Sequence, residues 1–149
     1  MLPVKKILAT TDFSEPSRLG VKQAVELAEH FGAEVILAHA TPPLRAVSGA
    51  TTVAGYYLPK VSEEINVEAE EVAERMREEE IPSSVRSSVH ILHGKAAEAV
   101  TDFAREEGVD LIVMASRGES GWKQLLTGSV TQRVLGHAPC PVLVVTQPD

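Results

Sequence analysis

Hydrophobic and polar residues follow two different periods along this chain, and the two periods alternate. Short runs rich in Val, Ile and Leu are typical of strands covered on both faces of a sheet. Longer segments with apolar residues three and four positions apart are typical of helices that bury one side. The short runs predict strands over Val4–Thr11, Glu34–Ala40, Ser84–Leu92, Val109–Ala115 and Val142–Thr146.

The longer segments between these strands predict helices. Ser14 is favourable at a helix start, and Gly32 suits the position just past a helix end, so the first helix lies between them. Its apolar positions include Phe31, and those of the second helix include Ile65. The later helices are predicted over Val61–Glu80, from Ala96 to Gly108, and over Ser129–His137 with Val130 and Val134 on one face.

The segment Thr41–Pro59 follows neither period. Its prolines and glycines, among them Pro43, Gly55 and Pro59, predict a long loop. Long loops within compact domains are commonly lids or binding loops, but some are insertions without a role. The sequence leaves both interpretations open.

The alternation of strands and helices predicts the fold class. It indicates an α/β fold with an open parallel sheet, right-handed crossovers and helices on both faces. The length of 149 residues favours a single domain over 1–149. Ligands of such sheets bind outside the carboxyl ends of the strands. Asp12, Ala40 and the segment Ala115–Ser129 follow or end predicted strands and are expected at that edge.

The segment from Met114 to Ser129 is the best candidate for a phosphate site. It runs from a buried strand through Gly118, Gly121 and Gly128 to the start of a helix. Glycine lets the backbone approach an anion closely. The helix start offers unpaired N–H groups and a partial positive charge. Arg117 could add a full positive charge, or it could be an ordinary solvated residue.

Charge and composition exclude several classes of function. The net charge is −7, and nine glutamates between Lys60 and Glu80 account for most of it. No basic patch indicates a nucleic-acid partner. No apolar run is long enough for a membrane span, and no leader pattern stands out. Because Cys140 is the single cysteine, no intrachain disulfide can form, and we expect a cytoplasmic protein.

The motifs of several enzyme classes are absent from the sequence. The segment around Gly118 lacks the G-x-S-x-G pattern of serine hydrolases, because Trp122 occupies the position of the last glycine. Neither the Walker P-loop nor the G-x-G-x-x-G dinucleotide pattern is present. We therefore expect a binder or slow switch rather than an efficient enzyme, since no residue set that activates water is evident.

The chain also resembles the universal stress protein family. The resemblance runs along nearly the whole sequence, through "ILATTDFSEPS" at Ile7, "LAEHFGAEVILAHA" at Leu27, "GVDLIVMASRG" at Gly108 and "GSVTQRVLGHAPCPVLVV" at Gly128. Nucleotide-binding members share a signature of Gly, two residues, Gly, nine residues, then Gly-Ser or Gly-Thr. Here nine residues separate Gly118 from Gly128-Ser129, but Ala115 replaces the first glycine. Alanine is strained at this position if a positive φ is required, and is tolerated if only close backbone approach is required.

The resemblance implies a Rossmann-like five-stranded sheet of order 3-2-1-4-5 and dimers formed through the last strand, Val142–Val145. It implies ATP or AMP as ligand, with Mg²⁺ as a candidate companion. Asp12 is then expected at the adenosine and Ala40 at the adenine, although Asp12 could instead be an ordinary turn residue. The full candidate set is Thr11, Asp12, Ala40, Met114, Ala115, Arg117, Gly118, Gly121, Gly128, Ser129 and Val130.

Three hypotheses follow from the sequence. The first is an adenine-nucleotide-binding stress or regulatory protein, which is homodimeric and has a protein partner still to be identified. The second is a homodimeric interaction module of the same fold that has lost nucleotide binding, with Ala115 as the first sign of that loss. The third, and the weakest, is a Rossmann-like enzyme such as a nucleotidyl transferase.

Overall fold

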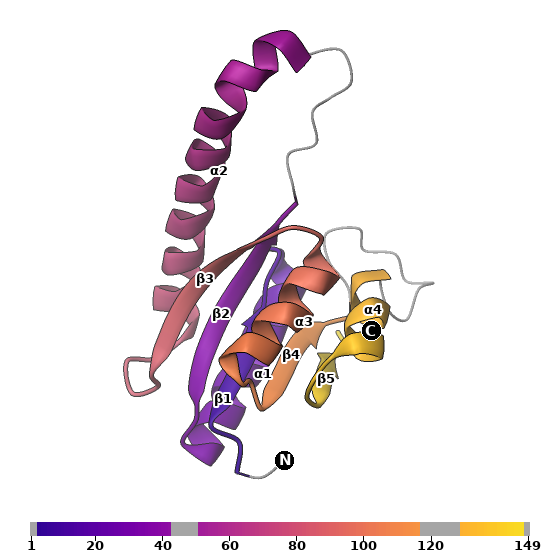
Figure 1. Cartoon of the computed structure of the whole chain (residues 1–149). Coiled ribbons are helices and arrows are strands. Elements are labelled where there is room, and N and C mark those ends of the chain that lie inside the picture. The colour runs from indigo at the N-terminus through magenta and orange to yellow at the C-terminus, as the bar shows by residue number, and fades with distance from the viewer. Residues whose placement is uncertain (1–2, 43–50, 117–128, 148–149) are drawn as a thin grey trace.

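The computed structural model describes residues 3–42, 51–116 and 129–147, and the side chains of residues 51–62 lie outside this description. Strands and helices alternate along the chain (Figure 1). They are β1 (Lys6–Thr10), α1 (Glu15–Phe31), β2 (Glu34–Thr41), α2 (Thr51–Glu80), β3 (Ser87–His93), α3 (Ala96–Glu107), β4 (Leu111–Ala115), α4 (Ser129–His137) and β5 (Val142–Val145). The strands form one five-stranded sheet of order β3-β2-β1-β4-β5. All pairs are parallel, so the predicted fold class and strand order are confirmed.

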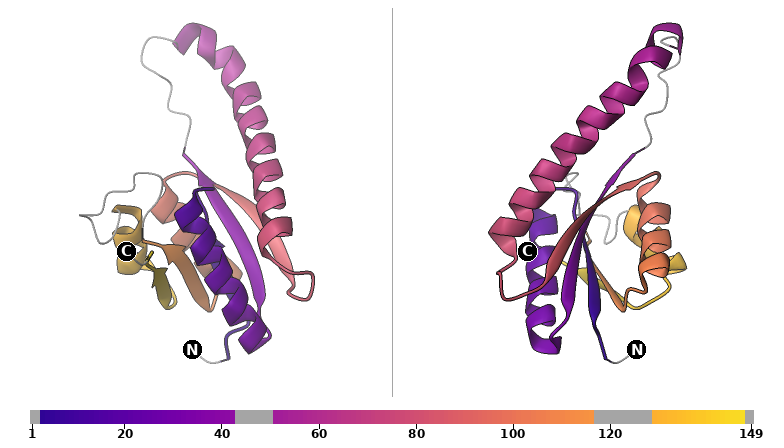
Figure 2. Two further views of the ribbon diagram at one scale, coloured as in Figure 1. Left: turned by 180° about the vertical axis from the view of Figure 1, so that it is seen from behind. Right: turned by 60° about the vertical axis from the view of Figure 1, so that its left-hand side comes forward.

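The sheet is covered on both faces by helices (Figure 2). Helices α1 and α2 lie on one face, and α3 and α4 lie on the other. Successive strand residues point to opposite faces, so Ile7 and Ala9 pack with α1 while Leu8 packs with α3 and α4. The two resulting cores explain why the strands read as continuous apolar runs.

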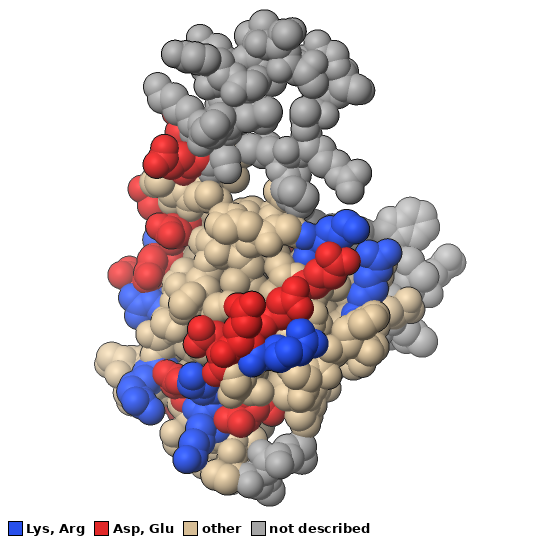
Figure 3. All heavy atoms as spheres, viewed as in Figure 1, with Lys and Arg blue, Asp and Glu red and all other residues tan. Residues whose placement is uncertain are grey.

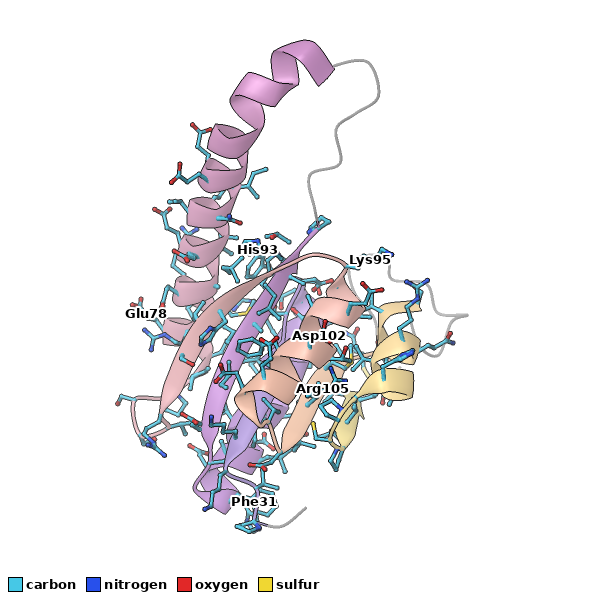
Figure 4. All side chains as sticks on the ribbon, in the orientation of Figure 1. Phe31, Glu78, His93, Lys95, Asp102 and Arg105 are labelled. Carbon is cyan, nitrogen blue, oxygen red and sulfur yellow. The ribbon has the colours of Figure 1, made fainter. Side chains whose placement is uncertain are left out.

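The predicted ends of α1 are confirmed. Ser14 is its N-cap, and the Ser14 hydroxyl accepts a hydrogen bond from the backbone N–H of Ser17 at 3.3 Å. Gly32 ends the helix at φ 67°, a left-handed conformation that favours glycine. Phe31 was expected on the apolar side of α1 but is 41% exposed. It is the last residue of the helix and lies at the end of the sheet (Figure 4), which agrees with its partial exposure.

The prediction for the start of α2 was wrong. A loop was expected over Thr41–Pro59, but α2 begins at Thr51 and includes Gly55 and Pro59. A proline inside a helix removes one hydrogen bond, and the remaining turns of this 30-residue helix are long enough to absorb that loss. The first turns of α2 extend well beyond the sheet (Figure 1). Residues 43–50, the rest of the expected loop, lie outside the described residues.

Some strands begin later than predicted, and their hydrogen bonds give the reason. Val85 and Val109 are buried, as their apolar character indicates. However, the Val85 N–H donates to Pro82 O in a turn, and the Val109 N–H donates to Ala104 O at the end of α3. An apolar residue indicates burial, whereas a strand residue is defined by its backbone hydrogen bonds. Val85 and Val109 are therefore buried without belonging to a strand.

Charged residues occupy the outer faces of the helices. Figure 3 shows acidic side chains along α2 and α3, with basic side chains interspersed. One cluster joins α1 to α2, because the Arg18 guanidinium lies 2.7 Å from Glu80 and 3.0 Å from Glu79. The hydrogen bond to Glu80, and then that to Glu79, raises the pKa of Arg18. Within the described residues, no helix has the length and apolar character needed to cross a membrane.

Candidate functional site

The strand register brings three of the predicted site segments to one edge of the sheet. Thr10 pairs with Ala38 on β2, and Ala9 pairs with Val113 on β4. The carboxyl ends of β1, β2 and β4 therefore lie next to one another, with β1 in the middle. Thr11 and Asp12 follow β1, Ala40 lies near the end of β2, and Met114 and Ala115 end β4.

Thr11 holds the turn between β1 and α1. Its hydroxyl is buried, lies 2.8 Å from the Ser17 hydroxyl and accepts a hydrogen bond from the Phe13 N–H at 2.9 Å. The hydroxyl also lies 3.3 Å from the Met76 sulfur of α2, and the Thr11 N–H donates to Ala38 O at 2.9 Å. These contacts make the Thr11 side chain a structural anchor that positions the residues beside it.

Asp12 is exposed at the tip of the same turn. Its Oδ1 accepts a hydrogen bond from the Ser14 N–H at 3.0 Å and another from the Ser14 hydroxyl. This is the usual way in which Asp closes a turn before a helix. Asp12 is thus a turn residue, and its exposure leaves the carboxylate within reach of a ligand at the sheet edge.

Ala115 has an ordinary strand conformation. It pairs with Val145 of β5, and the next residue, Ser116, donates its N–H to Val145 O at 2.9 Å. Among the described residues other than glycine, Phe13 alone has a positive φ. Position 115 therefore does not require the left-handed conformation, and alanine there causes no backbone strain. Met114 is buried against α3 and α4, while Ala115 is half-buried.

The end of β4 is approached closely by α1 at Gly20. A Cβ atom placed on Gly20 would lie 3.4 Å from Ala115 N and 3.6 Å from Met114 C. Gly20 thus allows the helix to pack against the backbone from which the candidate loop starts. Gly20 is not among the site residues predicted from the sequence, although a glycine inside a strong helical pattern commonly has such a packing reason.

The phosphate part of the candidate site is only partly described. Ser129 and Val130 are the first residues of α4, where backbone N–H groups have no partner within the helix. Both side chains are exposed, whereas Val134, one turn further along the same face of α4, is fully buried. Val130 lies in the first turn, ahead of the part of the helix that rests on the sheet. Arg117, Gly118, Gly121 and Gly128 lie outside the described residues.

Phe13 and His39 form an aromatic pair beside the site. Phe13 has φ +67°, and its ring stacks on the His39 ring with centroids 4.2 Å apart and an interplanar angle of 27°. His39 Nδ1 lies 2.8 Å from Thr11 O, so it carries a proton and donates it. His39 is therefore a packed residue with a hydrogen bond to the backbone. No local sequence signal indicates the positive φ of Phe13, because bulky residues rarely adopt it.

The parts of the chain that the structure describes contain no dedicated metal site. No group of three or more His, Cys, Asp or Glu side chains is placed there to hold an ion. His90 and His93 point to opposite faces of β3, because residues three apart on a strand alternate sides. His90 contacts Phe103 of α3, and His93 contacts Thr41.

Comparison with known proteins agrees with this architecture. The model of the universal stress protein family matches residues 3–146. The chain belongs to the universal stress protein family. Universal stress protein MJ0531 of Methanocaldococcus jannaschii is 33% identical over 97% of this chain and 83% of its own. Universal stress protein YxiE of Bacillus subtilis is 31% identical over 94% of this chain and 97% of its own.

A solved universal stress protein structure is similar over almost its whole length. That structure is of MJ0577 from Methanocaldococcus jannaschii, which is 30% identical to this chain. The match covers 97% of each chain with a TM-score of 0.82. The order of elements and the position of the carboxyl edge are therefore those of a universal stress protein.

Proposed function

We propose that this universal stress protein binds an adenine nucleotide, ATP or AMP, across the carboxyl ends of β1, β2 and β4. The conformation of Ala115 is the observation that carries the proposal. Because Ala115 pairs with Val145 as a regular strand residue, replacing the first signature glycine introduces no backbone strain at this position. The remaining signature residues, Gly118, Gly128 and Ser129, are all present in the sequence.

Each part of the nucleotide then has a partner in the candidate site. The adenine lies against the backbone at Ala40, and the exposed Asp12 carboxylate accepts hydrogen bonds from the adenosine part. Met114 and Ala115 lead the chain toward the ribose. The phosphates lie at the N-terminus of α4, at Ser129 and Val130, where the helix dipole favours negative charge. Arg117, Gly118, Gly121 and Gly128 complete this part of the proposed site.

Mg²⁺ would be held mainly by the nucleotide. Magnesium commonly takes phosphate oxygens and water with one or two carboxylates, so it does not require a protein cage. We also propose a binder or slow switch rather than an efficient ATPase, because the sequence shows no residue set that would activate water.

Other universal stress proteins support this choice of ligand. A universal stress protein solved in complex with cAMP shares the fold at 23% identity and a TM-score of 0.62. The universal stress protein from Archaeoglobus fulgidus solved in complex with dAMP shares it at 18% identity and a TM-score of 0.57. At these identities the likeness concerns the fold, and the assignment of a nucleotide to this chain is our proposal.

Mass spectrometry of small molecules released from freshly purified protein tests the proposal. The expected result is an adenine nucleotide in an amount that approaches the protein concentration. An Ala115→Gly variant purified in parallel is the matched comparison. If the variant carries nucleotide and the native protein carries none, the second hypothesis, an interaction module that has lost nucleotide binding, replaces this proposal.

A homodimer through β5 is our second proposal. In the described sheet, β5 forms its strand pairs with β4 and lies at the edge. Leu143 of this strand is 36% exposed, and Leu135 of the neighbouring α4 is 48% exposed. Apolar edge strands commonly pair with another chain. Light scattering during gel filtration should show a dimer that Leu143→Lys converts to a monomer, and a native monomer would exclude this assembly.

A further inference from the structure

A cavity lies on the α2 side of the sheet, next to the proposed nucleotide site. It has a volume of 510 Å³ and is lined by residues from the ends of β2 and β3, the β1–α1 turn and the middle of α2. His39, Thr41 and His93 lie on the face of the sheet that α1 and α2 cover, whereas Ala40 packs on the opposite face. Figure 4 shows His93 at the end of β3, beside α2. Cavities of roughly 300–1,000 Å³ commonly hold small molecules.

One wall of this cavity is aromatic and fixed. Phe13 and His39 both line it, and their rings are stacked 4.2 Å apart. The ring of His39 is held by its hydrogen bond to Thr11 O at 2.8 Å. Helix α2 contributes the apolar residues Ile65, Ala69 and Val72 to the opposite wall, together with Asn66 and Glu68. A flat apolar body fits between these two surfaces.

The two histidines that line the cavity both have Nδ1 engaged. Thr41 Oγ1 donates to Leu92 O at 3.2 Å, so it must accept from His93 Nδ1, which lies 3.1 Å away. His39 Nδ1 donates to Thr11 O in the same way. In the neutral form of each ring, Nε2 is then left as a hydrogen-bond acceptor. A ligand that meets these rings must therefore donate hydrogen bonds.

The charge around the cavity favours a cation. Glu68 lines the cavity, and no Lys or Arg is among the described residues that line it. Glu64 and Glu71 lie on the same exposed side of α2 as Glu68. Asn66, which also lines the cavity, can donate or accept hydrogen bonds and so is compatible with a cation or an anion. Carboxylate and imidazole acceptors, combined with an aromatic wall, match an organic ammonium group on a planar apolar body.

We propose that this cavity is a second ligand site, which binds a small amine with an aromatic body. The ammonium group donates hydrogen bonds to Glu68 and to the imidazole Nε2 atoms, and the aromatic body lies between the Phe13–His39 pair and α2. The side chains of His39, Thr41 and His93 lie on the other face of the sheet from the Ala40 side chain, so we propose this as a second site that adjoins the nucleotide site.

Titration of the full chain with three indoles of similar size, followed by amide NMR, tests this inference. Tryptamine carries the ammonium group, tryptophol replaces it with a neutral hydroxyl, and indole-3-acetate carries a negative charge. Tryptamine should shift the amides of Thr41, Asn66 and Gly94 in a saturable way, tryptophol should bind more weakly, and indole-3-acetate should not bind. No saturable shift with tryptamine up to about 10 mM overturns the proposal, as does equal binding of indole-3-acetate.

Two exposed residues allow a matched test by mutation. Glu68→Gln and His93→Ala should each weaken tryptamine binding about tenfold, whereas Glu71→Gln, on the same helix but outside the cavity, should leave it unchanged. If Glu71→Gln weakens tryptamine binding as much as Glu68→Gln does, the attraction comes from the overall negative charge of α2, and the proposed site is wrong. Saturating ATP should leave the tryptamine shifts in place, and competitive displacement by ATP would show that the cavity belongs to the nucleotide site instead.

Discussion

Gly20 of α1 lies directly against Ala115 at the end of β4, and a Cβ atom on Gly20 would stand 3.4 Å from Ala115 N. This contact couples the first helix to the strand from which the candidate phosphate loop departs. The space accepts one methyl group at ordinary contact distance, and any further methyl group would add to this contact. The residue at position 20 therefore sets how closely α1 can approach the site.

Substitution at Gly20 should have opposite effects for small and branched side chains. Gly20→Ala should raise the free energy of unfolding by about 0.5–1 kcal/mol, because alanine favours helix more than glycine does. Gly20→Val should lower it by about 1–3 kcal/mol, because its extra methyl groups press on the Met114–Ala115 backbone. Urea denaturation measures both. Equal destabilisation by the two variants would contradict the described packing.

Asp12 can be tested for its turn role and its ligand role separately. Asn at this position retains an oxygen that accepts from the Ser14 N–H but removes the charge. Asp12→Asn should keep the stability within about 0.5 kcal/mol and weaken nucleotide binding about tenfold. Asp12→Ala should also lower the free energy of unfolding by about 1 kcal/mol, because the turn loses its acceptor.

Calorimetric titration with ATP, alongside urea denaturation, measures both effects of the Asp12 variants. If Asp12→Asn binds ATP as the native protein does, Asp12 is a turn residue alone. The assignment of the adenosine end of the nucleotide would then have to change.

Asp110 stabilises the opposite edge of the sheet. Its Oδ2 accepts hydrogen bonds from the backbone N–H groups of Lys5 at 2.8 Å and Lys6 at 2.9 Å, which tie the start of β1 to the start of β4. Asp110→Ala should lower the free energy of unfolding by about 1–3 kcal/mol. Glu106→Ala, an exposed acidic position on α3, is the matched control and should change it by less than about 0.5 kcal/mol. Similar losses in both variants would point to net charge rather than these two bonds.

The thiol of Cys140 should become reactive at a higher pH in the folded protein than in the unfolded chain. Burial raises the pKa of the Cys140 thiol, a backbone hydrogen bond with Ile112 opposes this, and the charge of Asp110 adds to the rise. At a given pH the folded protein therefore holds less thiolate, which is the reactive form. The rate of alkylation by iodoacetamide should reach half its maximum at a higher pH in the folded protein than in the same protein in denaturant. Coincident pH profiles would contradict this environment.

Most of the sheet could be predicted from the sequence, because burial on both faces leaves continuous apolar runs such as that of β2. Ser14 and Gly32 could be predicted as helix ends from their local chemistry. The start of α2 could not, because Gly55 and Pro59 usually interrupt helices and their cost is outweighed only within a long one. The local preference of a residue therefore predicts secondary structure only where the stability of the surrounding element does not outweigh it.

Some features of the candidate site could likewise be predicted from the sequence, and others could not. Asp12, Ala40 and Ala115 could be placed at one edge from the order of strands alone. The positive φ of Phe13, its stacking on His39 and the closeness of Gly20 to Ala115 depend on contacts between distant segments, which no local pattern encodes. The sequence left the conformation of Ala115 open, and only its pairing with Val145 of β5 determines it.

The most direct measurement is calorimetric titration of ATP and AMP, with Mg²⁺ present, into the native protein and into Ala115→Gly. Because Ala115 lies in an unstrained strand conformation, the native protein should bind a nucleotide saturably with Kd below about 1 mM. The glycine variant should bind within about threefold of the native protein. Absence of binding by the native protein, together with clear binding by Ala115→Gly, would contradict the central claim.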